Sequence, residues 1–306
     1  MKKRTILSLL AIVLFLGLGY FIYVTTGKTL SYVSVSINPD IQLGLNEKGI
    51  VKEVTALNDE ADVIIADLEL LNKDVLEAVD LVVEATIETG YINEYSDEND
   101  VIVTAVDERE ENRQKLEKRV VERVNKKLSE KKVYGLVVVN GVNDELKAEA
   151  KKYDVSNGKM LLMDRAVTVN PKLTKEELST MSIKDIQSEI KAYVEKRRES
   201  LNVSKKEMTE TMKKEKEELR NAHKKEVESL KDELLDNADV DTNSMNAEEK
   251  KETLSSLINE RKEKIKENVE KYKREVIKEV EKKTYPELKK SIENERNKIK
   301  RGQERE

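Results

Sequence analysis

The most regular pattern of apolar and polar positions runs from Ser31 to Leu45. From Val33 onward its odd positions are apolar or proline, and most of its even positions are polar. An alternation with period two is typical of a half-buried β-strand. The pattern passes without a break through Asn38-Pro39, although a proline cannot donate a hydrogen bond to a strand ladder. We therefore predict a single strand whose hydrogen bonding is interrupted at Pro39 while its apolar face continues.

Further periodic segments predict the rest of a mixed α/β fold. Turn-forming residues at 46–49 precede a second predicted strand at 50–57. Beyond it, helical stripes at 75–87, 116–128, 143–153 and 156–170 alternate with short apolar strands at 101–106 and 136–139. We expect Gly90 to end the first helix, Thr174 and Glu177 to form the capping box of another, and 136–139 to be a central strand because it is wholly apolar. The prediction is one α/β domain with a mixed sheet over residues 28–190, which is long enough to bury a core.

The C-terminal part, residues 191–306, is dominated by charge, with 32 basic and 29 acidic side chains. Apolar residues recur at helical spacing on both sides of a polar link at 236–248. The two arms, 182–235 and 246–300, each have about 55 residues, or ~80 Å of helix. Their equal length predicts an antiparallel helical hairpin. A disordered tail disagrees with the regular apolar spacing, whereas an oligomeric coiled coil remains an open alternative.

The N-terminus predicts a membrane anchor. After Met1-Lys2-Lys3-Arg4, the nineteen residues 6–24 carry no charge, which is long enough for a helix to cross a bilayer. Basic residues ahead of the span keep the N-terminus in the cytoplasm. We expect a cytoplasmic stub at 1–4, a transmembrane helix at 5–27 and an extracytoplasmic remainder. A cleaved signal peptide is the alternative, but its apolar core would be shorter and followed by small residues.

Composition narrows the chemistry. The 306 residues include no cysteine, so disulfides, zinc–thiolate sites and a thiol nucleophile are excluded. The net charge is −5 and no basic patch is interleaved with aromatic residues, so we expect no nucleic-acid partner. The single histidine, His223, is expected to be a solvated helix residue, and no glycine-rich phosphate loop is present. We predict no cofactor, no metal site and no enzyme with multiple turnovers.

Asn38 and Pro39 are the candidate site residues. Proline's nitrogen has no hydrogen, so the usual attack of the following backbone nitrogen on an asparagine side chain is closed. The remaining cyclisation has the Asn38 amide nitrogen attack its own carbonyl carbon, which expels Pro39 and cuts the chain. This reaction needs a strained or polarised peptide bond. The structural alternative is an ordinary strand-edge proline, and the second such pair, Asn170-Pro171, is expected only to end a helix.

Several stretches resemble one family. The run YVSVSINPDIQLGL at 32–45, followed by a turn and VKEVTALN, is similar to the juxtamembrane extracytoplasmic domain of RsgI-type anti-sigma factors, which are single-pass sensors of clostridia and bacilli. The stretches ETGYI at 88–92, YDVSNGKMLLMDRAV at 153–167 and TKEELSTMSIKDI at 174–186 agree with it. The resemblance implies that the Asn38-Pro39 bond is cut by the protein itself and that the two pieces stay paired in the sheet.

The resemblance also has a limit. The family has a sigma-binding cytoplasmic domain ahead of its membrane helix, whereas only four residues precede the span here. The resemblance therefore supports the outer domain and the topology, but not direct anti-sigma activity. We expect a membrane-anchored signalling or sensor protein, cut at Asn38-Pro39 as part of regulated proteolysis, with an intramembrane protease acting on the stub. The alternative is an uncut envelope anchor or docking arm, whose C-terminal helices bind a protein partner or self-associate.

Overall fold

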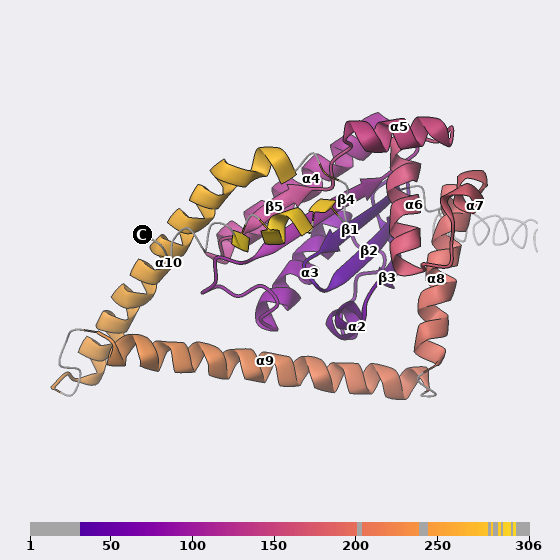
Figure 1. Ribbon diagram of the computed structural model, residues 1–306. Coiled ribbons are helices and arrows are strands. Elements are labelled where there is room, and N and C mark those ends of the chain that lie inside the picture. Colours follow the sequence, from indigo (N-terminus) through magenta and orange to yellow (C-terminus); the bar gives the residue numbers. More distant parts are fainter. Residues whose placement is uncertain are drawn as a thin grey trace, which may run out of the picture.

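The computed structural model describes residues 31–200, 204–238 and 244–280, together with 283, 287–288, 290–294 and 296–297. A five-stranded sheet lies at its centre, with the strands in the order β3-β2-β1-β4-β5 (Figure 1). The strands are β1 (Ser31–Ser36), β2 (Asp40–Leu45), β3 (Val51–Ala56), β4 (Asp100–Val106) and β5 (Leu136–Val139). Neighbouring strands are antiparallel except β4 and β5, which are parallel. The predicted mixed α/β sheet is confirmed.

Helices connect and cover these strands, and several begin at the polar caps that the sequence indicates. They are α2 (Asp59–Ile65), α3 (Val75–Glu88), α4 (Glu110–Glu130), α5 (Asp144–Lys152), α6 (Asn157–Val169), α7 (Lys175–Thr180), α8 (Ile183–Glu199), α9 (Lys205–Asp236) and α10 (Ala247–Val280). Asn143 and Ser156 accept hydrogen bonds at the starts of α5 and α6, and Thr174 forms the predicted capping box of α7. Gly90, at φ 80°, follows the last turn of α3, in the left-handed conformation that glycine adopts without strain.

The alternating stretch 31–45 is two strands and a reversal, so the prediction of a single strand was wrong. β1 and β2 pair with Ser36 opposite Asp40, and residues 37–39 turn the chain. Odd-numbered residues of one strand lie opposite odd-numbered residues of the other. Because the reversal contains an odd number of residues, the apolar face continues across it. The alternation identified the buried face correctly. It could not distinguish one strand from this hairpin, because both give the same alternation.

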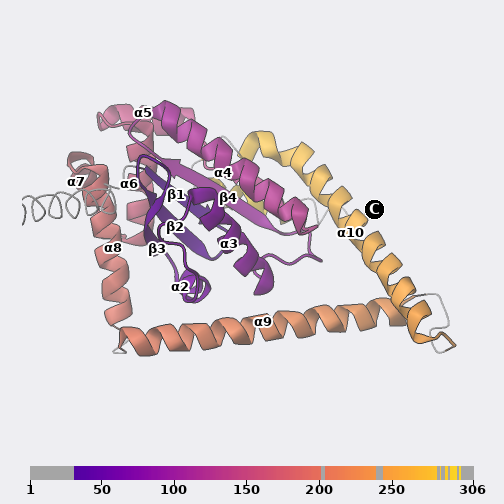
Figure 2. The same ribbon diagram turned by 180° about the vertical axis from the view of Figure 1, so that it is seen from behind.

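The two faces of the sheet differ in polarity. The odd-numbered face of the hairpin packs against α3 and α4 in a wholly apolar core that includes Val33, Val35 and Leu43. Seen from behind, these two helices lie across that face (Figure 2). The opposite face carries buried polar strand residues such as Gln42 and Thr104. It is partly covered by a second apolar cluster built mainly from α6 and α8, and so it offers room for a polar site.

β5 is an edge strand of the described sheet, so the prediction that it is central was wrong. Its side chains are buried nevertheless, because Leu136 and Val138 pack against Tyr272 of α10 and against Leu288 and Ile292. A run of apolar residues indicates that both faces of a strand are covered. It does not indicate whether both edges are paired.

The predicted C-terminal helices are present, but the predicted antiparallel hairpin is wrong for their arrangement. α8, α9 and α10 follow one another around the sheet like the sides of a frame, and α9 and α10 diverge from their junction (Figures 1 and 2). α9 is held to the domain by Lys216, whose fully buried ammonium donates to the Ile64 carbonyl at 2.6 Å and pairs with Asp67. On α10, the Asn268 amide donates to Asp97 at 3.1 Å. Both helices contact the α/β domain at separate points, and they do not lie along each other (Figure 1).

His223 on α9 is not the solvated residue that we expected. Only 10% of its side chain is exposed. It packs on Gly90, where an added Cβ would lie 2.9 Å from the His223 Nδ1. Gly90 therefore serves both the end of α3 and the close approach of α9. The error arose because α9 taken alone gives no sign that this side docks on another element.

The predicted stub at 1–4 and transmembrane helix at 5–27 lie outside the described residues. Within the described ranges, no helix has the length and apolar character that crossing a membrane requires.

Glu117 should make stability depend on pH. It lies on α4 with 13% of its side chain exposed, and Arg113 Nη1 is 2.7 Å away. Burial raises the pKa of Glu117 to about 7 despite the opposing effect of Arg113. This pKa is higher in the folded chain than in the unfolded chain. The contribution of Glu117 to the free energy of unfolding is therefore fully present below about pH 4.5 and is lost as the pH rises through 7, a change of about 3 kcal/mol. Thermal unfolding of Glu117→Gln across this range should lack that decline, and equal slopes for the two proteins would contradict the assignment.

Lys216 should be a stabilising contact between α9 and the domain. Lys216→Met keeps most of the side-chain volume but leaves the Ile64 carbonyl without its donor, which should lower the free energy of unfolding by about 1–3 kcal/mol. Lys213→Met on the same helix is the matched control. Lys213 is 43% exposed and pairs only with Glu210 at 3.4 Å, so its loss should change stability by less than about 0.5 kcal/mol. Chemical denaturation measures both, and equal effects would exclude the buried contact as a stabiliser.

Candidate functional site

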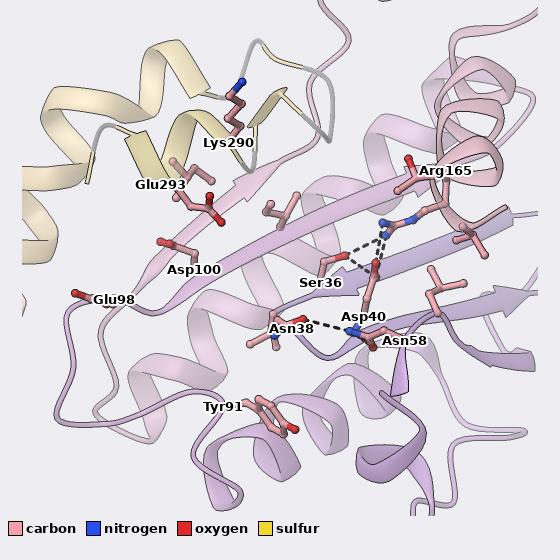
Figure 3. Close-up of a pocket in the computed structure, with 16 residues that line it drawn as sticks. Ser36, Asn38, Asp40, Asn58, Tyr91, Glu98, Asp100, Arg165, Lys290 and Glu293 are labelled. Carbon is pink, nitrogen blue, oxygen red and sulfur yellow. Dashed lines mark hydrogen bonds and ion pairs between the residues drawn. The ribbon is translucent and has the colours of Figure 1, made fainter. Parts of the chain in front are cut away.

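The Asn38–Pro39 bond lies in the reversal between β1 and β2 (Figure 3). The Ile37 amide donates to the Pro39 carbonyl at 2.8 Å and closes the turn across Asn38. Asn38 is exposed, whereas Pro39 is buried. The structure therefore brings the two predicted site residues to an accessible turn at the end of a central strand.

The backbone of Asn38 is in an unfavourable conformation. Its φ is 71°, in the left-handed region, whereas a residue before proline favours an extended backbone. The chain's other Asn-Pro pair provides a comparison, because Asn170 caps the end of α6 at φ −127° and ψ 93°. Sparsely populated backbone conformations cost about 1–3 kcal/mol and gather at functional sites. Of these two asparagines, only Asn38 carries such strain.

Asn58 connects the two sides of the turn. Its side-chain oxygen accepts hydrogen bonds from the Asp40 amide and the Ala61 amide, each at 3.0 Å. Its side-chain nitrogen donates to the Asn38 Oδ1 at 3.3 Å. The bond to Ala61 makes Asn58 the N-cap of α2. One amide therefore holds the side chain of Asn38, the backbone just beyond Pro39 and the start of a helix.

The Asp40 carboxylate is held by a buried arginine. Arg165 on α6, 7% exposed, places Nη1 2.7 Å from Asp40 Oδ2 and Nη2 2.9 Å from Oδ1. The Ser36 hydroxyl donates to the same carboxylate at 2.6 Å and accepts from Arg165 Nη2 at 3.1 Å. A bidentate, charge-assisted pair of this kind restricts orientation as well as contributing energy. It anchors both strands of the hairpin beside the turn.

A cleft of about 820 Å³ opens beside the reversal and is lined by Asn38, Asn58 and Arg165. On its far side lie Asp100 and the C-terminal residues Lys290 and Glu293 (Figure 3). Burial raises the pKa of Asp100 to about 6, although Arg296 opposes the shift. The cleft therefore gives water access to the turn on the side of Asn38. The turn lies between α6, which covers one part of the second face of the sheet, and the C-terminal residues, which cover another part.

The structure adds residues that sequence reasoning missed. Asn58, Asp40 and Arg165 each lie in stretches that carry the family resemblance, yet nothing local marks them as neighbours of Asn38. Asn58 and Arg165 are separated from Asn38 by whole elements and meet it only through the fold. The one local signal was Asn58 followed by acidic residues, which is typical of a helix N-terminus.

The fold and the site define a mixed α/β domain with a central strand that ends at a strained Asn-Pro bond. Residues 30–165 match the family model described as the anti-sigma factor RsgI-like central domain. Residues 30–165 are therefore similar to the central domain of RsgI-type anti-sigma factors, in agreement with the resemblance seen in the sequence.

Curated relatives agree with this assignment. Anti-sigma-I factor RsgI7 of Acetivibrio thermocellus is 26% identical over 189 residues, which cover 60% of this chain and 34% of that protein. RsgI6 of the same organism is 29% identical over 163 residues, covering 51% of this chain and 21% of the relative. Anti-sigma-I factor RsgI of Bacillus subtilis is 30% identical over 91 residues, covering 29% of this chain and 24% of the relative. The match thus spans between 21% and 34% of the length of these relatives.

The Arg165–Asp40 pair should be coupled energetically. Arg165→Met leaves the Asp40 carboxylate, 14% exposed, without its main counter-charge and should cost about 3 kcal/mol of stability. Asp40→Asn in the same chain removes that uncompensated charge and should recover part of the loss. Chemical denaturation of the two single variants and the double variant, all carrying Asn38→Gly so that the turn is the same in each, measures the coupling. Strict additivity would argue against the pair.

Proposed function

We propose that this chain is a membrane-anchored, RsgI-like sensor that cuts its own backbone between Asn38 and Pro39. The family assignment supports a signalling role. The strained conformation of Asn38 beside Pro39 is the observation that carries the self-cleavage proposal. The anchor is the apolar segment 6–24, with the N-terminus in the cytoplasm and the folded part outside the cell membrane.

Self-cleavage needs no cofactor. The Asn38 Nδ2 attacks the Asn38 carbonyl carbon and forms a new C–N bond. The bond to the Pro39 nitrogen then breaks, and the proton lost from Nδ2 ends on that nitrogen, which becomes a secondary amine. The first product is a succinimide at residue 38, which water in the cleft later opens. Each chain reacts once, so the protein is not a turnover enzyme.

The position of β1 explains how the two pieces would remain together after the cut. β1 lies between β2 and β4 and pairs with both. Val33 and Val35 of this strand are 0% and 2% exposed. Removing residues 1–38 therefore requires the extraction of a central strand from the sheet, against its ladders and the burial of its side chains.

Separation of the pieces would be the signalling event. A ligand or a load acting on the C-terminal helices pulls residues 39–306 away from the anchored strand, and an intramembrane protease then acts on the released stub. The names of the relatives support control of a sigma factor as the output. A protein that binds the C-terminal helices, or a second copy of the chain, is the proposed partner.

Denaturing gels and intact-mass measurements of the expressed protein test the cut. The wild-type chain should separate into residues 1–38, about 4 kDa, and the remainder of the 35.2 kDa chain. Asn38→Gly and Asn38→Ala should stay whole, and the glycine variant accepts the positive φ without strain. Under native conditions, the two wild-type pieces should co-elute.

Asn170→Ala is the matched control, because it removes the other Asn-Pro side chain and should leave cleavage unchanged. A wild-type chain that remains intact at all times would refute self-cleavage. That outcome would favour the alternative function, an uncut envelope anchor or docking arm.

A further inference from the structure

The orientation of the Asn58 amide is fixed by its surroundings. Two backbone N–H groups, those of Asp40 and Ala61, point at one end of this amide, so that end must be the oxygen. The nitrogen is therefore the end that faces Asn38. By the same reasoning, the atom of Asn38 that faces Asn58 is its oxygen, which identifies the other atom as the nucleophilic nitrogen.

We infer that Asn58 is a positioning residue for the backbone cut at Asn38–Pro39. This inference rests on the proposed self-cleavage. The Asn58 Nδ2 restrains the Asn38 side chain by its oxygen and leaves the attacking nitrogen unhindered by that contact. The same side chain holds the Asp40 amide, one residue beyond the departing Pro39. Asn58 thus fixes the nucleophile relative to the leaving residue, and such restraint accelerates an intramolecular attack.

The hydrogen bond has a second, chemical effect. A donor at Oδ1 withdraws electron density from the Asn38 amide and makes its N–H groups more acidic. The attacking nitrogen must lose a proton as the new bond forms, so this polarisation favours the reaction.

The helical cap ties this restraint to the rest of the fold. Asn58 begins α2, and α2 is held by α8 through Arg198 on Asp62 and by α9 through Lys216 on the Ile64 carbonyl. Asp62 is 4% exposed, so that ion pair is largely desolvated. The restraining amide is therefore mounted on an element with several tertiary attachments.

Asn58→Asp separates positioning from capping. Aspartate caps a helix as well as asparagine does and retains an oxygen for the Asp40 and Ala61 amides. When ionised it has no donor for the Asn38 Oδ1. The experiment is cell-free synthesis of the full chain followed by a chase at pH 7, with uncut and cut chains measured by intact mass. The expected result is a fall of about tenfold in the cleavage rate, which corresponds to the loss of one hydrogen bond.

A pH profile provides a readout that a purely structural role would not change. As the pH falls towards about 4, the new carboxyl becomes protonated and regains a donor. The cleavage rate of Asn58→Asp should then recover towards that of the wild type. A variant rate that stays equally depressed across this range would overturn the inference.

Asp74→Ala is the control for general destabilisation. Asp74 caps α3 through the Leu76 amide at 2.8 Å, so Asp74→Ala should cost at least as much stability as Asn58→Asp, which keeps its cap, without touching the turn. This variant should cut at the wild-type rate. Slowing equal to that of Asn58→Asp, or an Asn58→Asp chain that cuts at the wild-type rate, would overturn the role of Asn58. An uncut wild-type chain would instead refute the proposed function itself, so the two failures are distinguishable.

Discussion

The structure depends on β1 being a central strand. It pairs in antiparallel register with β2 on one side and β4 on the other, and its odd-numbered side chains lie in the main core. The direct covalent link from β1 onward is the reversal at residues 37–39. Because β1 is held by its pairing with β2 and β4 and by its buried side chains, the sheet does not need that link to keep β1 in place. The pairing of β1 with two neighbours would hold the strand in the sheet even if the chain were cut at residues 37–39.

The second face of the sheet determines the surroundings of the Asn38–Pro39 turn. One part of this face is covered by α6 and α8, and another part by α10 and the residues after it. The cleft lies between these covers, with the turn on its wall. Polar strand residues occupy this face, and the ion pair of Arg165 and Asp40 anchors the turn to α6. The turn is thus rigid on its strand side and accessible on its cleft side.

The C-terminal helices are part of the domain's structure. α9 lies against α2 and α3, where Lys216 reaches Asp67 and Arg220 reaches Glu88. α2 carries Asn58 at its first turn. Direct contacts therefore connect the charged helix α9, through α2 and Asn58, to the Asn38–Pro39 bond.

Local patterns were sufficient for most elements and for singling out the Asn38–Pro39 bond. The spacing of apolar residues predicted α3 and α4, the capping residues predicted the starts of α5, α6 and α7, and Asn38-Pro39 was recognised from its own chemistry. The pattern was insufficient wherever two structures share one periodicity. A strand and a hairpin with an odd reversal have the same alternation, and a central strand resembles an edge strand that is covered on both faces.

The sequence by itself determined which apolar positions of the α/β domain face a core, where several helices begin and which peptide bond is chemically unusual, because those properties depend on neighbours a few positions away. Only the tertiary structure decided that the bond lies in a reversal, that Asn58 and Arg165 surround it, and that the charged helices wrap the domain. Those features depend on contacts such as Arg165 with Asp40, separated by 125 positions. The spacing of apolar residues indicates that one face of a helix or strand is buried. Which other element packs on that face depends on the fold of the whole chain.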